Sequence, residues 1–102
     1  MPTTRILTRD GPACLEAVGE FDRDNHHEIA AAVRHAISRG HPHITLDLRG
    51  VTYLDASAVR TLMACRYLAL AHGGGLRVLH ANGVVAFVLD ATGAGAALSW
   101  NG

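Results

Sequence analysis

The chain has 102 residues, of which 49% are apolar and 5% aromatic, and its nine arginines balance nine acidic residues. A chain of this length forms one domain that buries about 60–70% of its unfolded surface. Zero net charge and scattered arginines argue against nucleic-acid binding, which requires a concentrated basic face. No apolar run approaches the roughly 20 residues of a transmembrane helix, and the first residues lack the apolar core of a signal peptide. We therefore expect a cytoplasmic protein with no membrane insertion.

The first half of the chain alternates between strand and helix signals. Residues 6–7 and 13–18 predict two short strands joined by the Asp-Gly turn at 10–11, because glycine accepts the backbone conformation that tight hairpins require. Asn25 and Glu28 predict a capping box, and apolar residues at helical spacing follow it as far as Gly40. Apolar residues then alternate with polar ones over 44–48, which predicts a strand.

The second half continues the alternation. A helix is predicted over residues 57–71, and the glycines at 73–75 end it before a strand over 76–79. Apolar spacing over 84–89 predicts a short third helix that stops near Gly93, and residues 96–100 suggest an edge strand. The side chains of the 57–71 helix that we expect in the core are Val59, Leu62, Met63 and Leu70.

Strands that alternate with helices imply mostly parallel pairing through right-handed crossovers. We therefore predict an α/β fold in one domain over residues 1–102. Its sheet should be mixed and mostly parallel with four to five strands, and about three main helices should pack mainly on one face.

The most informative segment is the corner Asp55-Ala56-Ser57-Ala58, where a hydrophobic strand gives way to a helix. Such a corner exposes backbone N–H groups and side chains to partners. On one interpretation the residues are structural, with Ser57 capping the helix and Asp55 holding the turn. On the other, the helix N-terminus stabilises an added phosphoryl group, as its free donors and partial positive charge allow.

Several motifs follow one another in an order and spacing that resemble the STAS domain family, in particular its anti-sigma factor antagonists. The similarity spans nearly the whole chain. The motifs are Gly19-Glu20-Phe21-Asp22, Leu46-Asp47-Leu48, Tyr53-Leu54-Asp55, the glycine turn and strand from Gly73 to Val78, and Phe87-Val88-Leu89 followed by Thr92-Gly93.

The resemblance implies a binding protein rather than an enzyme, with no cofactor. Its partner would be an anti-sigma factor of the serine-kinase, histidine-kinase-like ATPase type, from which it would release a sigma factor. The implied contact residues are Asp22, Asp55, Ser57 and Arg60.

The corner departs from the family pattern at two places. The family's phosphoacceptor serine is replaced by Ala56, and its glycine by Ala58. Ser57 matches the second hydroxyl residue of the motif and is the alternative phosphoacceptor, although displacement by even about 1 Å can cost 100-fold in transfer rate. The sequence therefore implies an antagonist that escapes phosphorylation at the usual position.

Other functions are less well supported by the residues. The histidine pairs His26-His27 and His41-Pro42-His43 lack the i, i+4 spacing of a zinc site, so no metal is expected. Ser57 lacks the Gly-x-Ser-x-Gly elbow of a hydrolase, so no catalytic residue is assigned. Two other roles stay open: a STAS subunit of an ABC-type lipid transport complex, and a non-enzymatic signalling scaffold that self-associates.

Overall fold

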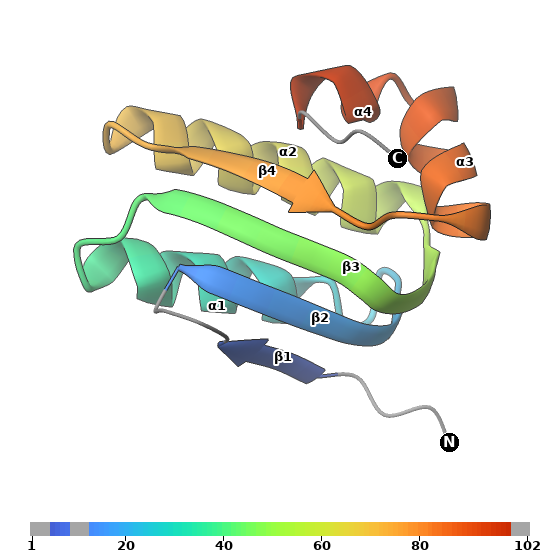
Figure 1. The fold of residues 1–102 in the computed structure, drawn as a ribbon, viewed down its shortest axis with the longest axis horizontal. Coiled ribbons are helices and arrows are strands. Elements are labelled where there is room, and N and C mark those ends of the chain that lie inside the picture. Colours follow the sequence, from blue (N-terminus) through green and yellow to red (C-terminus); the bar gives the residue numbers. More distant parts are fainter. Residues whose placement is uncertain (1–4, 9–12, 99–102) are drawn as a thin grey trace.

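The computed structural model describes residues 5–8 and 13–98, which form a sheet with helices on one face (Figure 1). The elements in chain order are β1 (Arg5–Thr8), β2 (Cys14–Phe21), α1 (His27–Ser38), β3 (His43–Leu54), α2 (Ala56–Ala71), β4 (Gly75–Leu79), α3 (Gly83–Ala91) and α4 (Ala94–Ala97). The strand order is β1-β2-β3-β4; β1 and β2 pair antiparallel and the other pairs are parallel. The predicted mixed α/β fold is confirmed.

The core lies between the sheet and helices α1 and α2. Alternate side chains of each central strand are buried toward the helices, whereas Thr45, Asp47 and Arg77 lie on the opposite face and stay partly or largely exposed. This period-two pattern is what a sheet covered on one face requires. The fully buried larger side chains are aliphatic except for Phe21; they are Ile29, Val33, Leu46, Leu48, Leu54, Leu62, Val78, Val85, Leu89 and Leu98.

Parallel pairing of β2 with β3 brings two loops to one edge of the sheet. Phe21, the last residue of β2, pairs with Leu54, the last residue of β3. The segments that follow them, beginning at Asp22 and Asp55, therefore leave the sheet side by side. This is the edge where ligand and partner sites of parallel sheets usually lie.

The expected edge strand over residues 96–100 was wrong for the part that can be described. Residues 94–97 form the short helix α4, which follows Gly93 in the left-handed conformation at φ 76°. The C-terminal segment contacts β4 through one backbone hydrogen bond, in which the N–H of Val78 donates to the carbonyl oxygen of Leu98 at 3.1 Å. Residues 99 and 100 lie outside the described residues.

Two expectations about side chains were also wrong. Leu70 is 45% exposed, since it follows the buried Ala69 and each helical residue turns about 100° from the last. Asn25 does not cap α1, which begins at His27 with His26 as its N-cap. Its side chain instead accepts from the N–H of Asp22 and donates to the carbonyl of Glu20, both at 2.8 Å.

Candidate functional site

The β3–α2 corner is built around the carboxylate of Asp55. Asp55 has an extended backbone and is the N-cap of α2. Its Oδ1 accepts the N–H of Ala58 at 2.9 Å and the hydroxyl of Ser57 at 2.8 Å. The cap is therefore Asp55 and not Ser57, whose hydroxyl supports the capping oxygen. A side-chain oxygen that accepts from the N3 amide is the usual way to close a helix N-terminus.

These donors also set the charge state of the corner. Partial burial alone would raise the pKa of Asp55, but hydrogen bonds from the N–H of Ala58, from the Ser57 hydroxyl and from the N–H groups of Ser57 and Arg23 outweigh it. The pKa of Asp55 is consequently below its ordinary value of 3.8. Hydrogen bonds to a carboxylate favour its charged form, so the corner carries a fixed negative charge at neutral pH.

The other corner residues differ sharply in accessibility. Ala56 is exposed at the first position of α2, and Ser57 is half-buried. Ala58 is fully buried in the core, so the methyl group that distinguishes it from the family's glycine lies inside the domain. Of the two departures from the family motif, only Ala56 changes the surface.

The loop after β2 lies against this corner, as the strand register requires. The N–H of Asp55 donates to the carbonyl of Phe21 at 3.1 Å, and the N–H of Arg23 donates to the Asp55 carboxylate. Asp22 accepts the N–H of Asp24 with its Oδ1 at 2.9 Å, which folds the loop back on itself. The structure thus brings Asp22 and Asp55 to one edge as two neighbouring acidic positions.

A hollow of about 540 Å³ opens beside the corner, between α2 and the segment that leads into α4. Ala56 and Arg60 lie on its wall, one helical turn apart, so Arg60 belongs to the same surface as the corner. The hollow also contains residues that the sequence did not single out, including Tyr67, which is 63% exposed. Its full lining is Ala56, Val59, Arg60, Met63, Ala64, Tyr67, Thr92, Gly93 and Ala94.

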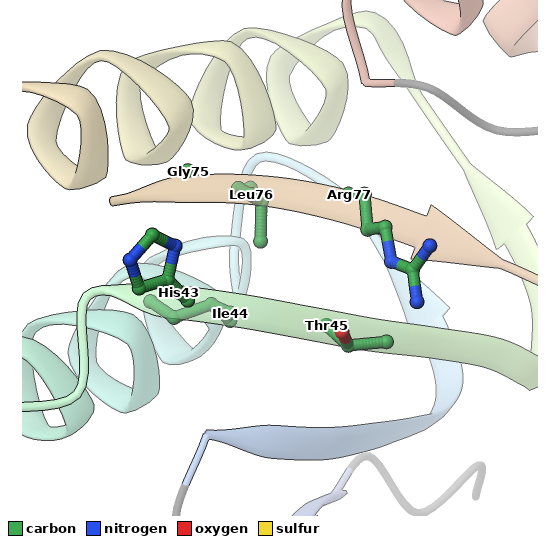
Figure 2. A pocket seen from close by; sticks show the side chains of 6 residues that line it. All are labelled: His43, Ile44, Thr45, Gly75, Leu76 and Arg77. Carbon is green, nitrogen blue, oxygen red and sulfur yellow. The ribbon is translucent and has the colours of Figure 1, made fainter. Parts of the chain in front are cut away.

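A second hollow, of about 420 Å³, lies on the sheet face opposite the helices (Figure 2). His43, Thr45 and Arg77 surround it, and Gly75, which pairs with His43, leaves it open because it has no side chain. It lies near the starts of β3 and β4, at the end of the sheet away from Asp55. This hollow is therefore separate from the corner.

Residues 5–8 and 13–98 contain no group of three or more His, Cys, Asp or Glu side chains that could hold a metal ion. Burial raises the pKa of the Cys65 thiol to about 11, against the small opposing effect of the Arg34 charge. Since the thiolate is the reactive form of cysteine, the raised pKa disfavours reaction of Cys65 at neutral pH. Within the same residues, no helix is long and apolar enough to cross a bilayer.

Solved structures that share this fold include two anti-sigma factor antagonists. An anti-sigma factor antagonist from Mycobacterium paratuberculosis superposes with a TM-score of 0.79 at 21% identity, covering 98% of this chain and 85% of the other. The anti-sigma factor antagonist SpoIIAA in its unphosphorylated form gives a TM-score of 0.72 at 19% identity, covering 98% and 89% of the two chains. No curated protein matches the chain by sequence.

Sequence comparison at the family level agrees with the fold. The model of the family described as "Mlab, STAS domain" matches residues 6–98. That match covers nearly all of the chain, including the corner, the loop after β2 and the hollow beside α2. The chain belongs to this family and is a STAS domain.

Proposed function

We propose that this domain is an anti-sigma factor antagonist that docks on a serine-kinase-type anti-sigma factor through the corner and the surface around it. The observation that carries the proposal is the exposed Ala56 between the acidic pair Asp22 and Asp55 and the hollow beside Arg60. The partner would release its sigma factor on binding, an exchange that belongs to the cytoplasm. Support comes from the STAS family match and from two antagonists that share the fold.

The proposed docking surface combines fixed charge with a pocket. Asp55 is locked by its hydrogen bonds, so its negative charge can orient a partner at little entropic cost. Arg60 supplies a positive charge one turn away. Tyr67 at the far end of the hollow is the kind of exposed aromatic side chain that often dominates binding energy. The small side chain of Ala56, which lies between Asp55 and Arg60 in the sequence, permits the partner to approach both charges closely.

The control of such an antagonist would differ from that of its relatives. Residue 56 stands where antagonists of this family carry the phosphoacceptor, and alanine offers no hydroxyl. The Ser57 hydroxyl is one residue further, half-buried, and donates to the Asp55 carboxylate at 2.8 Å. To phosphorylate Ser57, a kinase that is aligned on position 56 would have to break that hydrogen bond and change the direction of in-line attack. We therefore propose a domain that binds as a permanently unphosphorylated antagonist.

Incubation with the cognate kinase and ATP, followed by mass spectrometry of the intact protein, tests this control. The wild type should gain no phosphoryl group, whereas Ala56→Ser should gain one. The double variant Ala56→Ser/Ser57→Ala should gain one as well, because the acceptor would be residue 56. Stoichiometric phosphate on Ser57 of the wild type would contradict the proposal.

The partner itself is tested by capture from the native cell extract. Recovery of an ATPase-type anti-sigma factor supports the proposal, and Arg60→Glu and Tyr67→Ala should each reduce recovery about ten-fold, as truncated hot spots do. Arg77→Glu is the control, because Arg77 is exposed on the opposite face of the sheet. Recovery of a membrane ABC ATPase instead would favour the transport-complex role, and a stable homo-oligomer with no partner would favour the scaffold.

A further inference from the structure

A groove runs between α1 and α2 on the outer side of the helical layer. Two hollows of about 390 and 370 Å³ form it, and they share Arg34 and Leu68 in their walls. The first begins at His26 and Thr61, and the second ends at His72. The apolar residues that line the groove are Ala30, Ile37, Ala64, Cys65 and Leu68.

The groove has a charge character opposite to that of the corner. Its ionisable lining residues are Arg34, three histidines (His26, His27 and His72) and the thiol of Cys65, and none of its lining residues is a carboxylate. Burial raises the pKa of Cys65 to about 11 and keeps that thiol neutral. The groove therefore places one cationic side chain, Arg34, and three histidine rings along an apolar floor.

Two of the histidines are held in place before any ligand arrives. Nδ1 of His26 is hydrogen-bonded to the Thr61 hydroxyl at 2.6 Å, which joins the start of α1 to α2. Nδ1 of His72 lies 3.0 Å from the carbonyl oxygen of Leu68. A carbonyl oxygen can only accept, so Nδ1 of His72 carries a proton. Both rings are thus oriented at the two ends of the groove.

We propose that this groove is a second docking surface, which receives an acidic amphipathic helix of a partner protein. From Thr61 to His72 the groove spans about 16 Å, or roughly three helical turns. An apolar stripe at i, i+3/i+4 and i+7 would lie on the floor, as in other helix-in-groove complexes. Carboxylates beside that stripe would meet the Arg34 guanidinium in the middle and the histidine rings at the ends.

A designed peptide tests this surface without the anti-sigma factor, so its failure leaves the proposed function untouched. The probe is a fluorescein-labelled helical peptide of about 14 residues, with leucine in the stripe and glutamate on its flanks. The control peptide has lysine in place of every glutamate. In anisotropy titrations, the acidic peptide should bind at least about ten-fold more tightly than the basic one. Equal affinity would overturn the proposal.

Matched variants locate the binding. Arg34→Glu should weaken the acidic peptide at least about ten-fold, whereas Arg77→Glu, with the same change of net charge on the opposite sheet face, should alter affinity less than about two-fold. An equal loss of affinity in both variants would show an effect of net charge alone and would overturn the proposal that the groove binds the peptide.

Changes in the backbone amide NMR chemical shifts of the wild type on peptide binding locate the site independently. This measurement does not depend on whether a substituted protein folds. Shifts concentrated on Ala30, Ala64 and Leu68 support the groove, and shifts confined to the Asp55 corner overturn it. Complete displacement of the peptide by inorganic phosphate at matched ionic strength would show a simple anion site. Binding to anionic phosphatidylglycerol vesicles with no binding of the peptide would show a lipid surface, and either result overturns the proposed occupant.

Discussion

The two ends of α2 are closed by different means. At the N-terminal end, the side chain of Asp55 caps the helix and accepts the Ser57 hydroxyl. At the C-terminal end, Gly73 takes a positive φ of 84°, and the N–H of Gly74 donates to the carbonyl of Ala69 at 2.8 Å. One end is held by polar side chains at the surface, and the other by backbone that packs closely against the segment before β3.

The difference shows which residues are free to serve function. At the glycine end the chain runs so close to Pro42 that a side chain on Gly74 has no room. At the Asp55 end, side-chain hydrogen bonds close the helix instead. The exposed side chain of Ala56 takes part in none of them. A residue can therefore change at position 56 with little cost to the fold.

The largest expected effect lies at the glycine end. Gly74→Ala should lower the free energy of unfolding by about 3 kcal/mol or more, because the new Cβ would overlap the carbonyl group of Pro42 and the backbone must shift. Gly75→Ala is the matched control, since no heavy atom lies within 4 Å of its added Cβ; we expect a change within about 0.5 kcal/mol. Urea unfolding of both variants measures the difference, and equal stabilities would show that close packing of Gly74 against Pro42 does not hold the glycine end.

A smaller loss is expected at the capping end. Asp55→Ala should cost about 1 kcal/mol, the usual cost of removing an N-cap side chain, because the N–H of Ala58 loses its acceptor. Asp55→Asn should cost less, since the amide oxygen can still accept. The same urea series checks both, and a loss as large for asparagine as for alanine would show that the negative charge, and not the hydrogen-bond geometry, stabilises the cap.

Acid should weaken the capping end selectively. The pKa of Asp55 in the folded protein is below its ordinary 3.8, so its contribution to stability is fully present well above pH 3.8 and is lost as the pH falls through and below that value. The difference in unfolding free energy between the wild type and Asp55→Asn should therefore shrink as the pH is lowered from neutrality toward the acid range. A difference that stays constant would show that Asp55 titrates alike in the folded and unfolded chains.

The smallest effect should come from Ser57. Its hydroxyl donates to a carboxylate that keeps its bond from Ala58, so Ser57→Ala should cost about 0.5 kcal/mol. Thermal unfolding detects a change of this size, and a loss larger than that of Asp55→Ala would reverse the order of roles at this corner.

The sequence predicted the fold well because its boundaries carry local signals. Alternating apolar residues and the glycines at 73–75 placed the central elements near their observed positions. The segment around α4 was misjudged, since its small residues carry little periodicity and its placement depends on a tertiary contact, the bond between Val78 and Leu98.

The candidate site was predictable only in part. The resemblance to the STAS family implied Asp22, Asp55, Ser57 and Arg60 as contact residues. Parallel pairing of β2 with β3 brings Asp22 beside Asp55, and Arg60 follows Ala56 by one helical turn. Tyr67 was missed, although it stands seven residues after Arg60 and hence on the same helix face. Thr92 and Gly93 enter the hollow through tertiary packing of the C-terminal helices, which no local pattern encodes.

The hydrogen bond between Val78 and Leu98 affects whether a second chain can pair with the edge of the sheet. β4 is the last strand in the sheet order, and an open strand at that position is a template on which another chain can extend the sheet. Because the Leu98 carbonyl already takes the Val78 N–H at 3.1 Å, that donor is withheld from intermolecular pairing. Leu98, the C-cap of α4, thus covers part of the edge that β4 would otherwise offer to another chain.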